Sequence, residues 1–321
     1  MSRVKFVRPD EKSQLVATGI TVDPSTGLHK WKDEGKSSGR GQTFPPIKYF
    51  RPQGFQRIPK PKRGDWLDEH KEPGQSIARF STGPRCHPIP RKNVIYIQPL
   101  EFNEDQPIDA DLLKTLSEYA SLFFDLPVKL LKPVRDVEGK RELKAVTRRM
   151  GDYTEEPQAC ASEILEVLKG LKPKDAFSIC AITLCDIYPS EEYNFVFGHA
   201  SLMDETGVYS LARYLPETTE RPLLLRAIRV MCHEMCHMFG IKHCIYFSCL
   251  MNGSNHADEA VNRPTFLCPV CLRKLHFVCK FDIQARYEKL LMFWENLEFG
   301  GEARPVIYQT DIEFLQGRLA L

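Results

Sequence analysis

Three histidines and one glutamate between His233 and His243 have the spacing of a catalytic zinc site. Residues four apart lie on one face of a helix, so His233 and His237 can both direct a ring nitrogen at one metal ion. His243 can reach the same ion only if the helix ends before it, and Gly240 can adopt the left-handed conformation that ends a helix. A catalytic zinc has three protein ligands and a fourth position for water. Glu234, roughly 100° round the helix from His233, is placed to hold that water and to act as general base.

Four cysteines that follow the third histidine predict a second metal site. Cys244 and Cys249 form one pair, and Cys268-Pro269-Val270-Cys271 forms a knuckle further along the chain. Four thiolates with this arrangement are the ligand set of a closed, tetrahedral zinc site. The alternative is that they are buried free thiols that pack as small hydrophobic groups. A disulfide is disfavoured because the chain has 11 cysteines, an odd number, and no visible secretory signal. We therefore expect two zinc ions per chain, one catalytic and one structural.

The segment from His233 to Cys271, with Met251 two residues after Cys249, resembles the signature of the archaemetzincins, a branch of the metzincin zinc metallopeptidases. The resemblance implies these roles: catalytic zinc ligands His233, His237 and His243, general base Glu234, and structural zinc ligands Cys244, Cys249, Cys268 and Cys271. It also implies that Met251 lies in the turn beneath the metal. A looser similarity covers about residues 93 to 290 and includes Asn194–Gly198, which resembles the substrate-side edge strand of the family. His199 departs from the family pattern, so a subsite assignment there does not transfer.

The elements that must position these residues are predicted from hydrophobic patterns. We expect strands at Val94–Ile97, Val128–Val134 and Phe177–Ile187, and helices at Asp109–Phe124, Gln158–Leu168, Pro222 to the zinc histidines, and Asp282–Leu297. This alternation of strands and helices favours an α/β (α+β) fold with helices packed on a mixed β-sheet. The resemblance makes the sheet zincin-like, with an active-site helix and a smaller, zinc-braced C-terminal subdomain.

Composition divides the chain into three predicted regions. Residues 1–90 contain 11 of the 23 prolines, and residues 1–64 carry 14 Lys and Arg against 5 Asp and Glu, a balance of +9 in a chain of net charge +2. We expect this basic region, rich in Pro and Gly, to be partly disordered. Residues 91–300 are expected to form the archaemetzincin-like metallopeptidase domain, and residues 301–321 a C-terminal tail or helix.

The predicted site suits the hydrolysis of peptide bonds by a zinc-activated water, with peptides or proteins as substrates. An edge strand at Asn194–Leu202 would pair with an extended substrate, and Gly198 would allow the substrate to approach closely. The alternative is an ordinary edge strand with no role in binding. The group that stabilises the oxyanion opposite zinc stays open among Tyr209, Tyr214, Tyr246 and His256. The alternative function is a zinc-stabilised protein-binding module with little or no peptidase turnover, and an intact Glu234 argues against it.

Partners and location follow from composition. The basic N-terminal region could contact nucleic acid, acidic protein or anionic lipid, but such segments are more often solvated, and we do not expect a nucleic-acid partner. No apolar run is long enough to span a membrane, so no membrane insertion is expected. We expect an intracellular protein, cytoplasmic or nuclear. The sequence leaves its oligomeric state open.

Overall fold

The computed structural model describes residues 6–32, 44–103, 106–135, 143, 146–151, 156–214, 222–298 and 304–321. These residues form two compact units. One unit is continuous, Arg85–Gly240, and we call it the sheet unit. The other combines Met1–Pro84 with Ile241–Leu321, and we call it the helical unit.

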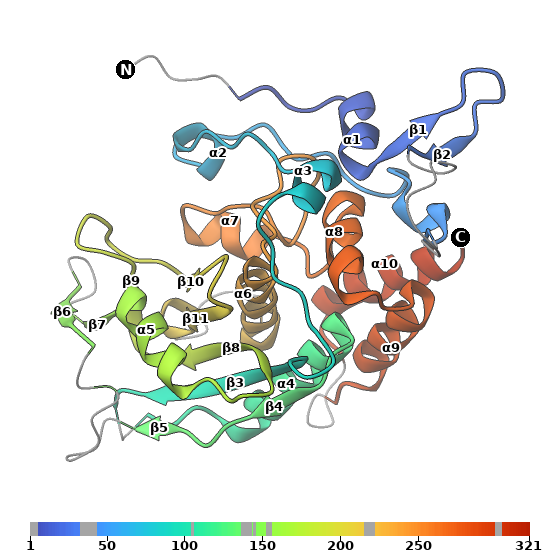
Figure 1. Cartoon of the computed structure of the whole chain (residues 1–321). Coiled ribbons are helices and arrows are strands. Elements are labelled where there is room, and N and C mark those ends of the chain that lie inside the picture. The colour runs from blue at the N-terminus through green and yellow to red at the C-terminus, as the bar shows by residue number, and fades with distance from the viewer. Residues whose placement is uncertain are drawn as a thin grey trace. The chain divides into compact units, whose positions relative to one another are not determined.

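The sheet unit holds most of the strands of the molecule (Figure 1). Its strands are β3 Val94–Glu101, β4 Val128–Leu130, β5 Val134–Arg135, β6 Arg148–Met150, β7 Pro157–Cys160, β8 Ala176–Thr183, β9 Asp186–Tyr188, β10 Gly198–Ala200 and β11 Thr206–Ser210. Its helices are α4 Ala110–Phe124, α5 Ala161–Leu171, the 3-10 turn η3 Ala212–Tyr214 and α6 Leu223–Met238.

The main sheet is mixed, as the sequence predicts. Its strand order is β10-β11-β8-β3-β4, and β5 also pairs with β3. The strands β11, β8, β3, β4 and β5 pair in parallel, whereas β10 lies at the end of the order and runs antiparallel to β11. The short strands β6, β7 and β9 form a second sheet. A parallel sheet needs cover on both faces, and helices supply it here.

The central strands β3 and β8 are buried along their whole length, which explains their nearly continuous apolar sequences. Alternate residues point to opposite faces. Tyr96, Ile179 and Val208 belong to the core that packs against α5. On the opposite face, Tyr209 of β11 lies near Cys232 of α6, so α6 covers the other side of the sheet.

Most predicted elements of this unit are confirmed, and Asp109 caps α4 by accepting a hydrogen bond from the Leu112 N–H at 2.7 Å. Three predictions were wrong in extent. The strand expected at Val128–Val134 is divided into β4, which ends at Leu130, and β5, which starts at Val134. The helix expected from Gln158 starts only at Ala161, because residues 157–160 form β7 and pair with β6 and β9. The strand expected to end at Ile187 ends at Thr183, and residues 186–188 join the second sheet as β9.

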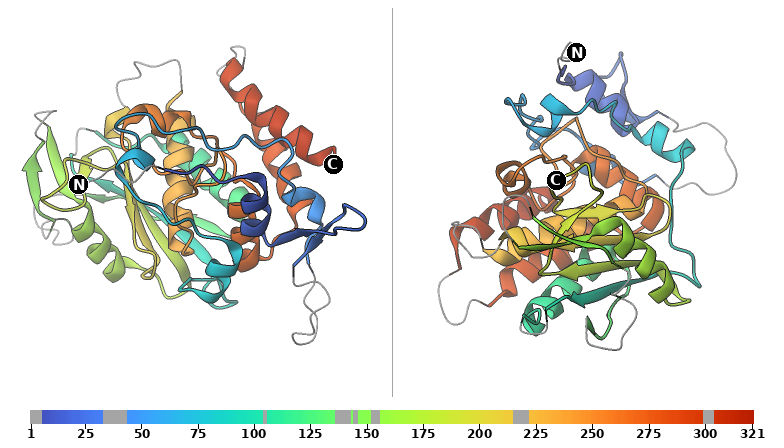
Figure 2. Two further views of the ribbon diagram at one scale, coloured as in Figure 1. Left: turned by 90° about the horizontal axis from the view of Figure 1, so that it is seen from above. Right: turned by 90° about the vertical axis from the view of Figure 1, so that its left-hand side faces the viewer.

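The helical unit is built from both ends of the chain. Its N-terminal elements are α1 Glu11–Thr18, β1 Ile20–Val22, β2 His29–Trp31, η1 Ile47–Phe50, α2 Trp66–Glu69 and α3 Ile77–Thr82. Its C-terminal elements are α7 Ala257–Asn262, α8 Pro269–Cys279, α9 Ile283–Asn296, η4 Val306–Tyr308 and α10 Gln309–Leu319. The helices α9 and α10 lie side by side in this unit (Figure 2).

The described part of the N-terminal region, residues 6–32 and 44–84, packs into the helical unit. Leu15, Trp31, Tyr49 and Phe50 are all buried. The Arg318 guanidinium of α10 donates a hydrogen bond to the Tyr49 carbonyl oxygen at 2.5 Å. The apolar residues of this segment are isolated between prolines and charges, so they show no helical or strand period, and only tertiary contacts reveal their role.

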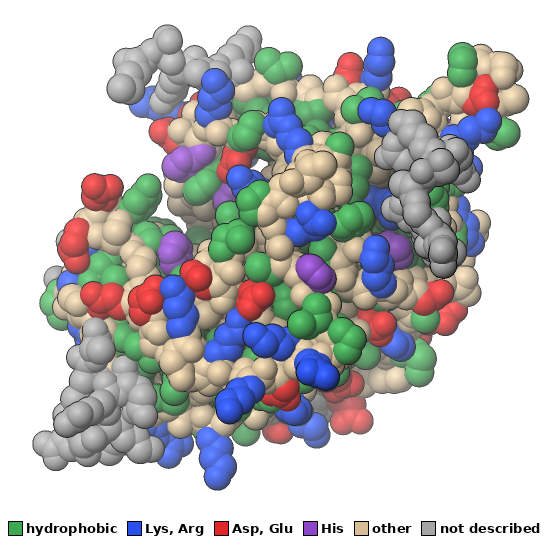
Figure 3. Space-filling view, viewed as in Figure 1, with side chains coloured by type: hydrophobic (Ala, Val, Ile, Leu, Met, Phe, Trp, Pro, Cys, Tyr) green, Lys and Arg blue, Asp and Glu red, His purple; other side chains and the backbone are tan. Residues whose placement is uncertain are grey.

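The face of the molecule drawn in Figure 3 carries both signs of charge. Figure 3 shows Lys and Arg side chains interspersed with Asp and Glu over the visible face. Among the described residues, no helix is both long and apolar enough to cross a bilayer.

Replacing Phe50 with Ala tests whether the N-terminal segment is part of this core. Phe50 is fully buried and packs edge-on against Trp31 at 5.2 Å between ring centroids. We expect the variant to lose about 3 to 5 kcal/mol of unfolding free energy, because truncating a buried Phe leaves a cavity. The control is Val7→Ala, at a side chain that is 81% exposed. Equal urea midpoints for the two variants would contradict a structural role for this segment.

Candidate active site

The two histidines His233 and His237 lie at the C-terminal end of α6 with their ring nitrogens converging. Their Nε2 atoms are 3.0 Å apart, and the rings are nearly perpendicular at 88°. Two nitrogen ligands of a tetrahedral zinc ion, each at about 2.0 to 2.1 Å, are about 3.3 Å apart. The observed separation is close to this value, so the pair fits a shared zinc ion.

The helix ends where the sequence predicts. Gly240 has φ 85°, in the left-handed region, and its N–H donates to the His237 carbonyl oxygen at 2.8 Å. The preceding residue, Phe239, packs against Phe124 of α4 and Phe177 of β8, with centroids 5.4 and 4.5 Å away. These ring contacts fix the C-terminal end of α6 against the sheet. The sheet unit ends at Gly240, and the helical unit begins with Ile241.

Glu234 lies against strand β10. Its side chain is buried, and a Cβ atom added at Gly198 would lie 2.4 Å from Glu234 Cγ and 2.6 Å from Oε1. Real Cβ atoms do not approach other atoms so closely, so only glycine fits here. We expected Gly198 to allow the close approach of a substrate. The structure adds a different reason for glycine, which is the room that the Glu234 carboxylate itself occupies.

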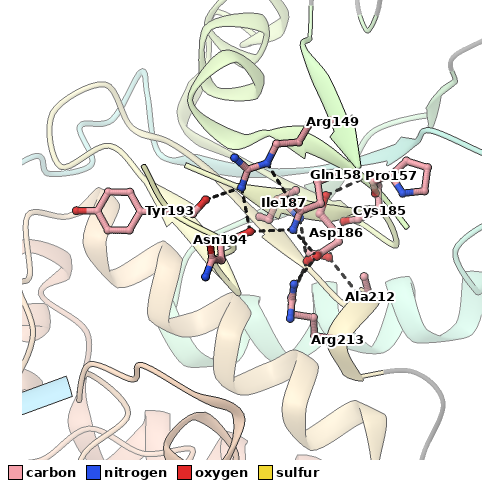
Figure 4. Close-up of polar contacts among 11 residues, drawn as sticks. Arg149, Pro157, Gln158, Cys185, Asp186, Ile187, Tyr193, Asn194, Ala212 and Arg213 are labelled. Atoms are coloured by element: carbon pink, nitrogen blue, oxygen red, sulfur yellow. Dashed lines mark hydrogen bonds and ion pairs between the residues drawn. The ribbon is translucent and has the colours of Figure 1, made fainter. Parts of the chain in front are cut away.

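The strand β10 is shorter than the edge strand expected at Asn194–Leu202. It covers only Gly198–Ala200, in register with Gly207–Tyr209 of β11. The preceding residues pair through an isolated bridge between Val196 and Ile187, and side chains also hold them (Figure 4). The Arg149 guanidinium donates to the carbonyl oxygens of Tyr193 and Asn194 at 2.5 and 3.1 Å.

A buried carboxylate anchors this network (Figure 4). Arg213 binds Asp186 through two hydrogen bonds, from Nε at 2.9 Å and from Nη2 at 2.7 Å. Gln158 donates to Asp186 at 2.7 Å and to the Asn194 carbonyl oxygen at 2.9 Å. Because a bidentate Arg–carboxylate pair has a defined geometry, this network fixes the chain that leads into β10. The roles of Gln158, Asp186 and Arg213 were not predicted from the sequence, since these residues are far apart in the chain and match no motif.

The four predicted zinc cysteines come together in the helical unit. The sulfur atoms of Cys244, Cys249, Cys268 and Cys271 lie within 4.8 Å of one another, and all four residues are buried. The Cys244 and Cys268 sulfurs are 3.6 Å apart. Zn–S bonds of about 2.3 Å in a tetrahedral site place two sulfurs about 3.8 Å apart, so the cluster fits a zinc ion.

Backbone N–H groups also point at this cluster. Met251 and Cys268 direct their N–H groups at the Cys249 sulfur, at 3.5 and 3.3 Å. Burial acts to raise the pKa of the Cys244 thiol, but hydrogen bonds with the other three thiols lower it well below its ordinary value. Burial raises the pKa values of Cys249 and Cys268. Zinc binding to this cluster would release protons, because the metal binds thiolates.

Met251 lies in a tight turn between these cysteines. It is fully buried, and its carbonyl oxygen accepts a hydrogen bond from the Cys244 N–H at 2.7 Å. Asn252 closes the turn, because its side-chain NH₂ donates to the carbonyl oxygens of Cys244 and Phe247 at 2.8 and 2.9 Å. A turn at Met251 is what the resemblance implies.

His243 lies in the helical unit, next to residues from the N-terminal segment. Its Nδ1 atom is 2.9 Å from Glu72 Oε1, and the Trp66 ring meets its ring edge-on at 4.9 Å. Burial acts to raise the pKa of Glu72, but the hydrogen bonds with His243 and Trp66 outweigh it and lower the pKa. Sequence reasoning missed Glu72 and Trp66, which precede the motif by more than 150 residues and carry no spacing signal.

One of the four candidates for stabilising the oxyanion, Tyr209, can be excluded from its position in the structure. The Tyr209 hydroxyl is enclosed in the core without a hydrogen-bond partner, and burial raises its pKa well above the ordinary value. Tyr214 is buried and stacks on Phe197 at 5.4 Å between centroids. His256 is paired with Asp65 at 3.1 Å. Tyr209 therefore cannot reach a substrate unless the core opens.

Comparison with known proteins identifies the family. The model of Peptidase family M54 matches residues 114–277. Archaemetzincin-2 of Rattus norvegicus is 36% identical over 290 residues, which cover 79% of this chain and 79% of that protein. Archaemetzincin-2 of Homo sapiens is 38% identical over 269 residues, 72% of each chain. The crystal structure of archaemetzincin from Methanopyrus kandleri aligns with 60% of this chain and 99% of its own, at 26% identity and a TM-score of 0.48.

The class of protein follows from the site and the family match together. The fold is a mixed α/β arrangement in which a buried helix ends in His-Glu-x-x-His, and the chain is a zinc-dependent metallopeptidase. It belongs to Peptidase family M54, the archaemetzincins.

Replacing Gly198 with Ala tests the contact with Glu234. The added methyl group must displace the Glu234 side chain, and for the general base that the sequence predicts a displacement of about 1 Å can cost on the order of 100-fold in rate. We expect kcat on a cleaved peptide to fall by about that factor, with little change in melting temperature. The control is Gly170→Ala in α5, where an added Cβ meets nothing within 4 Å. Full activity of the Gly198 variant would show that Glu234 needs no such room.

Proposed function

We propose that the chain hydrolyses peptide bonds at a zinc ion bound by His233, His237 and His243, with Glu234 as general base. The observation that carries this proposal is the convergence of the His233 and His237 Nε2 atoms to 3.0 Å beside Glu234. A pair of surface histidines has no reason to converge in this way at the buried end of a helix.

Two observations support His243 as the third ligand: the short chain that joins it to the end of the helix, and the contact of its Nδ1 atom with Glu72. His243 follows Gly240 by three residues, and the positive φ of Gly240 turns the chain away from the helix axis. A linker this short spans at most about 11 Å, so the imidazole stays near the helix end. Because Nδ1 of His243 contacts Glu72, Nε2 is the ring nitrogen that would bind the metal.

The catalytic steps that we assign to the protein are proton transfers by Glu234. Bound zinc would act as a Lewis acid and would lower the pKa of a coordinated water to about 7. Glu234 would accept the proton of the attacking water and later deliver it to the leaving amine. Both transfers need a carboxylate of fixed position, which the buried setting of Glu234 against Gly198 supports.

An extended peptide would bind along β10. This strand stands last in the order of the main sheet and lies directly beside Glu234 through Gly198. Addition of a substrate strand to a sheet edge supplies backbone hydrogen bonds irrespective of sequence. Burial lowers the pKa of His199 in the same strand, which favours the neutral form of its imidazole.

The cysteine cluster would hold a second, structural zinc ion. Four buried sulfur ligands leave no position for water, and the cluster begins at the residue after His243. Its role is then to brace the loop that carries the third histidine. A thiolate site of this kind suits a reducing compartment, which agrees with an intracellular location.

The metal content tests the two-site proposal. We expect two zinc ions per chain by elemental analysis of protein that has never met a chelator. Brief chelation should remove one ion and abolish peptidase activity, since structural zinc carries about 10 to 16 kcal/mol of apparent binding energy coupled to folding. The Cys268→Ser variant should lose the resistant ion and unfold at a lower temperature. A content of one zinc or fewer would refute the count.

The Glu234→Gln variant tests the general base. It keeps the size of the side chain but removes the base, so we expect kcat to fall about 100-fold to 10,000-fold with zinc content unchanged. A suitable control is Glu118→Gln, at an exposed carboxylate on α4. The assay is a peptide-library digest read by mass spectrometry. Full activity of Glu234→Gln would overturn the mechanism, and a wild type inactive on the whole library would favour the binding-module alternative.

A further inference from the structure

Glu72 belongs to the N-terminal segment and touches the predicted third zinc ligand. Its Oε1 atom is 2.9 Å from His243 Nδ1 and also accepts a hydrogen bond from the Trp66 Nε1–H at 3.0 Å. The side chain is mostly enclosed, with 18% exposure. One carboxylate oxygen therefore links the indole and the imidazole.

Trp66 is held firmly enough to orient this pair. Its backbone N–H donates to both carboxylate oxygens of Glu259, at 3.0 and 2.9 Å. Its ring lies so close to Gly253 that a Cβ atom there would be 2.4 Å from the indole Cδ1. Glu259 and Gly253 both lie in the chain beyond the zinc motif, so this part of the helical unit is built to receive the tryptophan.

The chain just after Glu72 is anchored to the loop that carries His243. The Lys242 N–H donates to Gln75 Oε1 at 3.0 Å, one residue before the histidine. At Gly74, φ is +69°, and a Cβ atom would lie 2.8 Å from both Ile245 Cδ1 and the Tyr246 hydroxyl. With contacts at Trp66, Gly74 and Gln75, the backbone on both sides of Glu72 is fixed relative to His243.

We propose that Glu72 is a positioning residue for the catalytic zinc, so that the N-terminal segment completes the zinc site from outside the motif. This inference rests on the proposed function, because it takes His243 as a zinc ligand. A carboxylate that accepts the Nδ1–H of a ligating histidine fixes its tautomer and ring orientation and raises the basicity of Nε2. The Trp66 contacts restrict where the Glu72 carboxylate can lie.

A purely structural role for the same contact makes a different prediction. If Glu72 only ties the N-terminal segment to the loop, its loss should lower the melting temperature without changing the affinity for the labile metal. If it positions His243, its loss should weaken the binding of the labile zinc. Removal of outer-shell partners of metal ligands typically costs about 10-fold to 100-fold in metal affinity.

The experiment measures zinc affinity, not activity, in the full chain. Protein stripped of its labile zinc is titrated with zinc against a chromophoric chelator, and the ion resistant to chelation serves as the internal standard. For Glu72→Ala we expect a dissociation constant for the labile site about 10-fold to 100-fold above the wild-type value, with the resistant zinc retained. For Glu72→Gln we expect a smaller rise, because the amide oxygen still accepts the Nδ1–H. The control Glu69→Gln removes an exposed carboxylate three residues earlier and should match wild type.

Trp66→Phe separates the hydrogen bond from the packing. The phenyl ring can still meet His243 edge-on, but the Nε1–H that fixes Glu72 is lost, so we expect a rise in the dissociation constant smaller than that of Glu72→Ala. Melting curves of the metal-stripped variants identify any variant that fails to fold, and Glu72→Gln is the conservative substitution that keeps the test valid in that case.

The His237→Ala variant distinguishes failure of this inference from failure of the proposed function. If His237→Ala abolishes labile zinc binding and Glu72→Ala binds zinc as tightly as wild type, the positioning role of Glu72 is refuted and the zinc site stands. If His237→Ala binds the labile zinc normally, the histidine site itself is refuted, and the inference about Glu72 falls with it.

Discussion

The constraint on which the rest of the structure depends is the convergence of two imidazoles at the end of α6. A metal ion bound by both His233 and His237 needs both Nε2 atoms within bonding distance of it. The 3.0 Å separation of these two atoms leaves little freedom for either ring. A helix holds two side chains four residues apart on one face, but only burial fixes their rotamers. The buried surface of α6, packed against β8, β10 and β11 and ending in the stack of Phe239, supplies that burial.

The same need for fixed geometry extends to the carboxylate and the strand beside it. Glu234 can lie against β10 only because Gly198 has no side chain, since a Cβ atom there would overlap the Glu234 side chain. The strand in turn is steadied by Asp186, whose buried carboxylate joins Arg213 and Gln158 behind the chain that leads into β10. The proton transfers that we propose for Glu234 require this precision, because the rate falls steeply with small displacements of a base.

The helical unit orders the loop between Gly240 and α7, which has almost no regular secondary structure. Between Gly240 and α7 the chain is held by the cysteine cluster, by the side chain of Asn252 and by the N-terminal residues Trp66 to Gln75. Ordering such a loop costs conformational entropy, so many specific contacts are needed to offset that cost. The fold uses residues from both ends of the chain to provide these contacts.

The sequence by itself determined the helix that carries His233, Glu234 and His237, its end at Gly240, and the grouping of the four cysteines. These features depend on helical period, on the backbone freedom of glycine and on local spacing, all of which are visible in a single chain. Only the tertiary structure decided that Gly198 makes room for Glu234, that Asp186 anchors the chain before β10, and that Glu72 meets His243. Each joins residues far apart in sequence, whose types carry no period or motif. The folded N-terminal region belongs with them, because its isolated apolar residues gain a role only when α8, α9 and α10 bury them.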